Sequence, residues 1–362
     1  MLLLINMRYI KDYTSSLEGK RVLVRIDVNE PVDYKGYPQD TFRIQKALHT
    51  INFLRQAKAK IILIAHLGDP QKEGKDGFSL ELISKVLGQL GGFDITFIGK
   101  NIEGIDSNII NNMSDGEVVF LENLRFDIRE EENSIEFAKK LAQFADLYVS
   151  DAFSVMHRNH SSVVAITEIL PSFGGLVVEQ ELEALNYILN NPTKPAVAII
   201  GGAKISTKLP VIQTLELIFD YILVGGKIAN EYIDEYRDSK SDKIILPVDF
   251  VDAKRYDIGP KTRELFAGYI AKASTVIWNG PMGWFEQKPY DEGTSFIAMA
   301  VAQNEDSYSV IGGGETVDEV HNLYQDSKID FISTGGGAML EYIATKGNLP
   351  GIIALQNNTL EL

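Results

Sequence analysis

Cysteine is absent from this 362-residue sequence. Its absence excludes disulfide bonds, thiolate metal sites and cysteine nucleophiles, and it fits a reducing cytoplasm. Long hydrophobic runs are also missing, and no apolar stretch reaches the length that spans a bilayer. The apolar opening Met1–Ile5 is short and has no basic flank or small-residue cleavage site. We therefore interpret it as a poor signal peptide, with Met7 as an alternative start.

An excess of positive charge is missing too. The sequence has 35 Lys and Arg against 50 Asp and Glu, a formal net charge of −15. This balance argues against nucleic-acid or anionic-membrane partners. An anionic ligand must therefore be held by a local group of basic residues. Neither GxxxxGK[ST] nor GxGxxG occurs, so neither a Walker-A loop nor a Rossmann dinucleotide site is expected.

The remaining composition is that of a globular protein with two hydrophobic cores, 45% hydrophobic and 23% charged. Short β-rich runs alternate with amphipathic helical stretches. This alternation predicts an α/β fold of two doubly wound, Rossmann-like lobes with parallel sheets, joined by a helix hinge. The predicted strands are Arg21–Ile26, Lys60–Ile64, Ile95–Ile98, Val118–Leu121, Leu147–Val149, Ala196–Ile200, Tyr221–Val224, Thr275–Trp278, Tyr308–Ile311 and Phe331–Ser333.

The boundary between the lobes is expected near Pro171–Gly175. The predicted lobes are residues 1–174 and 175–344, and a connecting helix is expected near residues 178–190. The acidic run Arg129–Glu132 is interpreted as a solvated helix start, where carboxylates meet the positive end of the helix dipole. We assign it no function.

Charged or amide residues follow the strands of the first half. They are Asp27, Asn29, Arg43, His66, Arg125 and Arg158. Ligands of open α/β sheets bind at the carboxyl ends of strands, and arginine binds carboxylate and phosphate bidentately. A single arginine is more often a surface ion-pair partner, but several at successive strand ends predict an anion site. His157 and His160 have no acidic third ligand, so no metal site is predicted there.

Glycines follow the strands of the second half, at Gly201–Gly202, Gly225–Gly226, Gly280, Gly312–Gly314 and Gly335–Gly337. Glycine lets backbone N–H groups approach a phosphate, and a helix N-terminus adds positive potential. One glycine pair alone is more often a tight turn, but five such strand ends predict a phosphate site. Lys204 and Lys208 lie one helical turn apart, so both can face it.

Glu315 follows the triple glycine and has two readings. Its carboxylate could be a magnesium ligand, or it could be an acidic residue favoured by the helix dipole. Taken alone, the residue favours the second reading.

In order along the chain, these segments resemble the phosphoglycerate kinase family over essentially the whole sequence. Each motif is modest alone, and the ordered set is specific. The matching segments are Lys20–Pro31, Ala65–Pro70, Leu121–Phe126, Ser150–Phe153, His157–Arg158, Gly201–Lys204, Asp257–Thr262, Trp278–Gly283, Ile311–Gly314 and Ser333–Ala338.

The resemblance implies reversible phosphoryl transfer from 1,3-bisphosphoglycerate to ADP, giving 3-phosphoglycerate and ATP. It implies that the N-terminal lobe binds 3-phosphoglycerate through Asp27, Val28, Asn29, Arg43, His66, Leu67, Gly68, Asp69, Arg125 and Arg158. It implies that the C-terminal lobe binds ADP or ATP through Gly202, Lys204, Lys208, Gly225, Gly226, Asn279, Pro281, Glu286, Gly313, Gly314, Glu315 and Thr316, with Gly225 and Gly226 at the adenine.

The resemblance also implies a magnesium ion, held mostly by nucleotide phosphates and touched by Glu315. It implies that the tail, residues 345–362, returns to the N-terminal lobe. It favours a cytoplasmic monomer whose partners are these small molecules, with no nucleic acid or membrane.

The resemblance further gives Arg43, Lys204 and Lys208 as the catalytic residues. Phosphoryl transfer needs alignment and stabilisation of spread negative charge rather than covalent help. Arg43 from one lobe and Lys208 from the other are expected to clamp the moving group. Catalysis should then require hinge closure.

Four positions depart from the family pattern. Asp69 stands where arginine is usual, Glu315 where aspartate is usual, and Lys227 where a third glycine is usual, and residues 231–257 are shorter than the family's stretch. Asp69 and Lys227 motivate an alternative, a catalytically impaired paralogue that still binds a nucleotide. An unrelated doubly wound binder would require the ordered motifs to be accidental.

Overall fold

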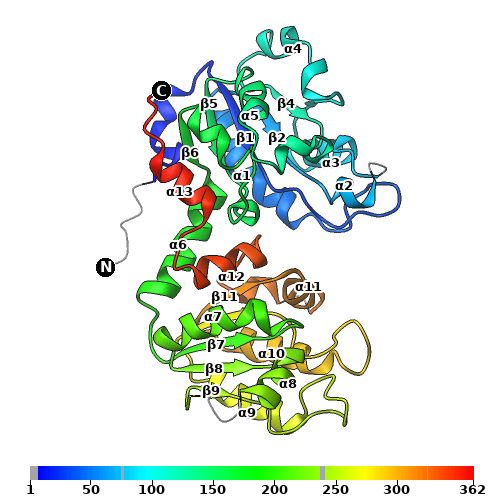
Figure 1. Ribbon diagram of the computed structural model, residues 1–362, viewed down its shortest axis with the longest axis vertical. Helices are drawn as coiled ribbons and strands as arrows, with labels where there is room; N and C mark the ends of the chain where they lie inside the picture. The colour runs from blue at the N-terminus through cyan, green and yellow to red at the C-terminus, as the bar shows by residue number, and fades with distance from the viewer. Residues whose placement is uncertain (1–6, 75–76, 237–240, 324) are drawn as a thin grey trace. The chain divides into compact units, whose positions relative to one another are not determined.

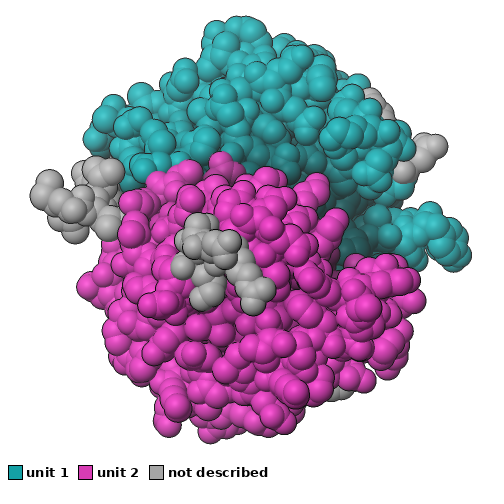
Figure 2. Space-filling view, turned by 60° about the horizontal axis from the view of Figure 1, so that its bottom comes forward, with its two compact units in different colours: residues 1–181, 348–362 teal, residues 182–347 magenta. Residues whose placement is uncertain are grey.

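The structure is a computed structural model that describes residues 7–74, 77–236, 241–323 and 325–362. Contacts divide the chain into two compact units, which Figure 2 colours separately. Unit 1 comprises Met1–Glu181 and Asn348–Leu362, and unit 2 comprises Leu182–Gly347. The division falls inside helix α6, Leu176–Asn190. The opening Met1–Ile5 lies outside the described residues, so its interpretation stays a prediction.

Unit 1 is built on a parallel six-stranded sheet in the order β3-β4-β2-β1-β5-β6 (Figure 1). Its strands are β1 (Arg21–Arg25), β2 (Lys60–Ile64), β3 (Ile95–Ile98), β4 (Val118–Leu121), β5 (Leu147–Ser150) and β6 (Ser172–Gly174). Its helices are α1 (Phe42–Gln56), α2 (Pro70–Glu73), α3 (Glu81–Gly91), α4 (Ser107–Asn111), α5 (Ile135–Ala142) and α13 (Pro350–Asn357).

Both faces of this sheet are buried. In β1, Val22 and Val24 belong to one apolar cluster, whereas Leu23 belongs to another. Successive side chains of a strand point to opposite faces, so a strand buried on both faces has apolar residues at every position. This burial explains the continuous apolar runs in the sequence.

Unit 2 has a second parallel six-stranded sheet, in the order β12-β11-β10-β7-β8-β9. Its strands are β7 (Ala196–Ile200), β8 (Tyr221–Val224), β9 (Ile244–Ile245), β10 (Thr275–Asn279), β11 (Tyr308–Gly312) and β12 (Phe331–Ile332). Its helices are α7 (Ile205–Ile218), α8 (Gly226–Glu235), α9 (Pro260–Ile270), α10 (Glu292–Gln303), α11 (Gly314–Asn322) and α12 (Gly336–Ala344).

The strand order identifies where each sheet should bind a ligand. In unit 1 the order reverses between β1 and β5, and in unit 2 it reverses between β7 and β10. Open α/β sheets bind ligands outside the carboxyl ends of the strands at such a switch point. The residues that follow these four strands are therefore the first candidates for function.

The predicted α/β class is confirmed, because both sheets are parallel and carry helices. Each predicted strand is present, whereas β6 and β9 were not predicted. Strand β6 lies within Pro171–Gly175, where the sequence predicted the boundary between lobes, and the structural division comes later, after Glu181. The predicted limits of the two ligand-binding lobes stay a prediction. No helix among the described residues is both long and apolar enough to span a membrane.

The interpretation of Arg129–Glu132 as a solvated helix start is wrong. Glu130 ends a short 3₁₀ turn, Ile128–Glu130, and α5 begins only at Ile135. The Glu130 side chain is buried, and its carboxylate accepts hydrogen bonds from the backbone N (3.0 Å) and Oγ (2.5 Å) of Ser162. Burial raises the pKa of Glu130, and nearby Arg25 opposes that rise.

A second buried carboxylate, Asp151, links β5 to the start of α6. Its Oδ1 accepts hydrogen bonds from the backbone N of Val177 (2.9 Å) and of Val178 (3.4 Å). These two N–H groups belong to the first turn of α6, where helices have unpaired donors. Burial raises the pKa of Asp151 to about 7, although these hydrogen bonds oppose the rise.

We predict that Asp151 makes the protein less stable as pH rises from 4 to 7. The folded state keeps a proton on Asp151 that the unfolded chain has lost, so its contribution is full below pH 4 and is lost as pH approaches 7. Asp151→Asn has no carboxyl group to titrate at this position. Its free energy of unfolding should therefore rise relative to that of wild type by up to about 4 kcal/mol from pH 4 to pH 7, at about 1.36 kcal/mol per pKa unit. Urea unfolding across the pH range tests this, and parallel curves for the two proteins would contradict it.

Candidate active site

The loop after β1 forms the first part of the unit 1 site. Asp27 is buried, and its Oδ1 accepts a hydrogen bond from the backbone N of Asn29 (3.0 Å). The side-chain oxygen of Asn29 accepts from the backbone N of Gly68 (2.8 Å). Hydrogen bonds of Asp27 and Asn29, two side chains predicted for the site, thus connect the loop after β1 with the loop after β2.

Arg43, on the first turn of α1, lies against this loop. Its Nη1 donates to the backbone oxygen of Asn29 (2.6 Å) and lies 3.7 Å from Oδ2 of Asp27. Its backbone N donates to Glu30 (2.7 Å), whose pKa is raised to about 7 by burial. A quarter of the Arg43 side chain is exposed, so the guanidinium is both positioned and accessible.

His66, at the end of β2, is oriented by a buried arginine that the sequence analysis did not select. Nη2 of Arg25 lies 2.9 Å from Nδ1 of His66. A guanidinium can only donate, so Nδ1 accepts and the imidazole proton resides on Nε2. Burial, with Arg25 as the next cause, lowers the pKa of His66 well below its usual value. His66 is therefore a neutral hydrogen-bond donor.

Arg25 belongs to a buried polar network beneath this site. Its Nε donates to Oγ of Ser162 (3.1 Å), which in turn donates to Glu130. Arg25 is only 1% exposed, and a buried cation requires hydrogen bonds and opposite charge. A charged residue at the end of an otherwise apolar strand is the signal that could have identified it in the sequence.

Arg125 and Asp69 lie on the loops after β4 and β2. Nη1 of Arg125 donates to the backbone oxygen of Gly68 (2.7 Å), while Nη2 is buried without a hydrogen-bond partner among the described residues. Oδ2 of Asp69 pairs with Nζ of Lys72 (2.6 Å). The carboxylate at position 69 is thus balanced by a cation three residues further on.

The other predicted residues of unit 1 also have defined places. Asn29, Arg43, Leu67 and Gly68 line a cavity of about 610 Å³. Arg158 is exposed, and its charge lowers the pKa of His66 and His160, so it lies on the same electropositive side. Val28 is buried.

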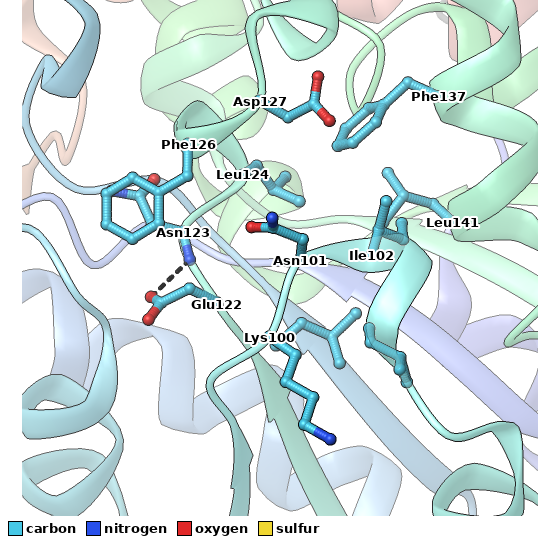
Figure 3. A pocket seen from close by; sticks show the side chains of 12 residues that line it. Lys100, Asn101, Ile102, Glu122, Asn123, Leu124, Phe126, Asp127, Phe137 and Leu141 are labelled. Atoms are coloured by element: carbon cyan, nitrogen blue, oxygen red, sulfur yellow. Dashed lines mark hydrogen bonds between the residues drawn. The ribbon is translucent and has the colours of Figure 1, made fainter. Parts of the chain in front are cut away.

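Asn123 positions the Leu67–Gly68 loop, a role that the sequence analysis missed. Its Nδ2 donates to the backbone oxygens of Leu67 (2.8 Å) and Phe78 (2.9 Å). Figure 3 shows it beside Glu122, whose carboxylate accepts from the Asn123 backbone N (2.7 Å). The adjacent cavity measures about 30 Å³, room for about one water molecule, so it is no substrate site.

The unit 2 site is formed by glycine loops packed backbone to backbone at the ends of β7, β8 and β10. A Cβ atom on Gly201 would lie 2.1 Å from the backbone oxygen of Pro281, and one on Gly280 would lie 2.4 Å from that of Gly201. Gly226 has a φ of +64°, and its Cβ would lie 2.7 Å from the backbone N of Gly202. Only glycine permits these close approaches.

Lys208, on the second turn of α7, is buried at this packed edge. Its ammonium group donates to Oδ1 of Asn279, whose Nδ2 donates to the backbone oxygen of Gly312 (2.7 Å). Burial lowers the pKa of Lys208 to about 8, and Glu315 opposes this fall. Lys204, by contrast, is exposed at the N-cap of α7.

The remaining predicted residues surround the start of α11. Gly313 has a φ of +106°, and Gly314 opens the helix. Oγ1 of the buried Thr316 accepts a hydrogen bond from the backbone N of Gly280 (2.9 Å). These contacts join the end of β10 to the loop after β11.

A cavity of about 480 Å³ in unit 2 is lined by several predicted residues, among them Gly202, Pro281, Glu286 and Glu315. Gly225 and Gly226 were predicted to lie at a base. Both are buried, Gly225 against Met282 and Gly226 against Gly202, and their place at a base stays a prediction, while Lys227 lines the cavity. Trp284 and Tyr256, which also line it, were not predicted.

Glu315 is the candidate metal ligand. Burial raises its pKa, and the neighbouring carboxylate of Glu286 raises it further, whereas Lys208 lowers it. Negative charge gathered at this point suits a hard divalent cation, which prefers carboxylate oxygen. No group of three metal-ligating side chains is found among the residues that the structure describes.

The chain is similar to known proteins over nearly its whole length. Residues 10–249 and 233–346 match the family model described as phosphoglycerate kinase. The solved phosphoglycerate kinase of Coxiella burnetii is 32% identical, with a TM-score of 0.79, over 94% of this chain and 96% of that one. The phosphoglycerate kinase of Pyrococcus horikoshii OT3 is 30% identical, with a TM-score of 0.85, over 97% and 98%.

We predict that anion binding to unit 2 weakens as pH rises through about 8, where free Lys208 loses its proton. Between pH 7 and 9 the affinity for inorganic tripolyphosphate should fall by about tenfold in wild type, because most of the lysine is then neutral. Lys208→Arg keeps its charge and provides the control, since titration of the ligand affects both proteins equally. Calorimetry measures both, and equal slopes would show that Lys208 is not the titrating group.

Proposed function

The chain belongs to the phosphoglycerate kinase family, and from this premise we propose which residues carry out its reaction. The reaction is reversible phosphoryl transfer from 1,3-bisphosphoglycerate to ADP, giving 3-phosphoglycerate and ATP. The observation that supports the assignment of residues is that basic groups lie near the topological switch point of each unit. In unit 1 these groups are guanidinium groups, and in unit 2 a buried lysine lies beside packed glycines.

Unit 1 binds 3-phosphoglycerate in this proposal. Arg125 offers the Nη2 that has no hydrogen-bond partner among the described residues, and Arg158 adds exposed positive charge. Arginine matches carboxylate and phosphate bidentately, as this ligand requires. His66 donates from Nε2 because Arg25 occupies Nδ1. Asp27 and Asn29 orient the loop and accept from the hydroxyl of the substrate.

Unit 2 binds the nucleotide in this proposal. The backbone N–H groups at the start of α7 and the side chains of Lys204 and Lys208 meet the phosphates, since helix N-termini attract anions. Magnesium would be held by nucleotide phosphates and by Glu315, whose site already gathers negative charge. A bound magnesium ion supplies neutralisation of the phosphate oxygens during transfer.

Charge stabilisation is the main requirement of the transfer step. In-line displacement spreads negative charge over the equatorial oxygens of the moving phosphoryl group, and fixed cations stabilise that charge. We assign this role to Arg43 and Lys208, with Lys204 as a further cation. The attacking atom is an already ionised phosphate or carboxylate oxygen, so no general base is needed.

The alternative, an impaired paralogue, is not favoured. Asp69, which motivated it, is paired with Lys72 rather than left as an uncompensated negative charge. Lys227, its second motive, is exposed on α8 at the cavity wall. A coupled assay of ATP-dependent 3-phosphoglycerate phosphorylation tests the function directly. Nucleotide binding without turnover would support the paralogue instead.

A cytoplasmic monomer is part of the same proposal. The absence of cysteine fits a reducing compartment, and the family resemblance favours a single chain. Sedimentation at micromolar concentration should give the mass of one chain, 40.3 kDa. A stable dimer would overturn the assembly proposal without affecting the assignment of the reaction.

We predict that Arg43→Ala lowers kcat by about 10²- to 10³-fold, the usual loss when one stabilising donor of a transition state is removed. Stability should change little, because the side chain is partly exposed. Arg55→Ala, at the other end of α1, is the matched control and should keep wild-type kcat. Steady-state kinetics decide, and a wild-type rate in Arg43→Ala would remove the assigned role.

We predict that position 69 tunes affinity for 3-phosphoglycerate. Asp69→Asn removes a negative charge beside the anion site, and Asp69→Arg adds a donor that can pair with the ligand. The KM for 3-phosphoglycerate should fall in the order wild type, Asn variant, Arg variant, by about tenfold overall, as expected for one charged hydrogen bond. An unchanged or higher KM in Asp69→Arg would show that the loop holds the ligand elsewhere.

A further inference from the structure

Carboxylates gather around the Arg43 guanidinium in unit 1. Oε2 of Glu30 lies 3.9 Å from Nε of Arg43, and Oδ2 of Asp27 lies 3.7 Å from Nη1. That Oδ2 is buried and has no hydrogen-bond partner among the described residues. Asp40, just before α1, adds a third carboxylate, which accepts from the backbone N of Thr41 (2.6 Å). An anion that binds Arg43 must therefore approach against an excess of negative charge.

Glu30 contacts both the backbone and the side chain of Arg43. Its Oε1 accepts a hydrogen bond from the Arg43 backbone N (2.7 Å), while Oε2 faces the guanidinium. Glu30 is only 7% exposed, and both residues line the cavity of about 610 Å³. A phosphate or carboxylate group bound in this cavity would pair with the same guanidinium. The Glu30 carboxylate is therefore a competitor of any anionic ligand of Arg43.

Protonation of Glu30 would weaken this competition. Burial raises the pKa of Glu30 to about 7, Arg43 opposes the rise, and Asp27 and Asp40 add to it. Further titratable side chains that line the same cavity are those of Asp33, Tyr34 and Glu73. Near pH 7 both the neutral and the charged form of Glu30 are therefore populated.

We propose that Glu30 is a positioning residue for Arg43, whose carboxylate competes with 3-phosphoglycerate for the guanidinium and takes up a proton from solvent when that ligand binds. This inference rests on the proposed function of unit 1. The ligand brings negative charge beside Glu30, and like charge favours the protonated form of a carboxyl group. The neutral group keeps an oxygen that accepts from the Arg43 backbone, but it attracts the guanidinium less.

The test compares wild type with Glu30→Gln, which cannot ionise but keeps the oxygen that accepts from the Arg43 backbone. Asp33→Asn is the matched control, because it removes a negative charge from the same cavity. The Asp33 carboxylate accepts from the backbone N of Lys35 (2.8 Å) and Tyr37 (2.9 Å), and an amide oxygen can replace it there.

The measurement is the number of protons taken up for each ligand bound. Calorimetry titrates the full-length protein with 3-phosphoglycerate, without nucleotide or magnesium, in Mops and in imidazole buffer at equal ionic strength. The two buffers differ in ionisation enthalpy, so the difference between the observed binding enthalpies gives the proton uptake. Titration of the ligand's own phosphate is common to all proteins, so it cancels when they are compared.

At pH 7 wild type and Asp33→Asn should take up as much as about half a proton more than Glu30→Gln, because Glu30 is about half protonated before binding. The difference should vanish near about pH 5, where Glu30 already carries the proton. Wild type and Glu30→Gln should bind 3-phosphoglycerate equally at about pH 6. At about pH 8 Glu30→Gln should bind about fivefold more tightly, as expected if the ligand raises the pKa of Glu30 by about one unit.

A folding control accompanies these titrations. At about pH 6 position 30 is largely neutral in both wild type and Glu30→Gln, so equal thermal unfolding midpoints there show that the variant has folded normally. Glu30→Met, a second neutral variant of similar length, should show the same loss of proton uptake.

Three results would count against the inference. Equal proton uptake by wild type and folded Glu30→Gln at pH 7 would overturn it, while the coupled assay would still decide the proposed function. The same loss of uptake in Asp33→Asn as in Glu30→Gln would show that the general charge of the cavity, rather than Glu30, is responsible. Wild-type protein that binds no 3-phosphoglycerate, and that also fails the coupled assay, would contradict both proposals.

Discussion

Buried positive charge at the carboxyl ends of parallel strands is the constraint on which both candidate sites depend. The chain carries a net charge of −15, yet its ligands are polyanions. Arg25 and Lys208 are 1% and 8% exposed, and each is held by directed hydrogen bonds, to Ser162 and to Asn279. A desolvated cation attracts a phosphate far more strongly than a surface lysine does, because water screens it less. These hydrogen bonds stabilise the two buried charges.

The two units differ in how they stabilise positive potential at the ends of their strands. In unit 1, Ser162 links Arg25 to Glu130 through hydrogen bonds, and Asp27 lies 3.7 Å from Arg43. Unit 2 instead brings backbone dipoles close together, which the glycines at strand ends allow. The difference fits the ligands proposed for the two units, because a small carboxylic acid phosphate needs bidentate recognition, whereas a nucleotide needs a long contact surface.

The sequence predicted most of the fold because buried parallel strands are apolar at every position. It missed β6 and β9, since three and two residues are too few for a pattern. The site residues were predicted from strand ends and from the family resemblance, but their partners were not. The burial of Glu130 depends on Ser162, far away in sequence, and the aromatic wall forms only because the fold brings Tyr256 to Trp284. Such contacts are tertiary, so the local periodicity of the sequence cannot predict them.

The central claim is that each unit binds one ligand through its own cation. The most direct test is calorimetric binding of 3-phosphoglycerate and of ADP to Arg43→Ala and Lys208→Ala, side by side. We predict that Arg43→Ala loses affinity for 3-phosphoglycerate alone and Lys208→Ala loses affinity for ADP alone. The affinity for the other ligand should stay within about twofold in each variant, because separate sites are energetically independent. Loss of both ligands in either folded variant would contradict the claim.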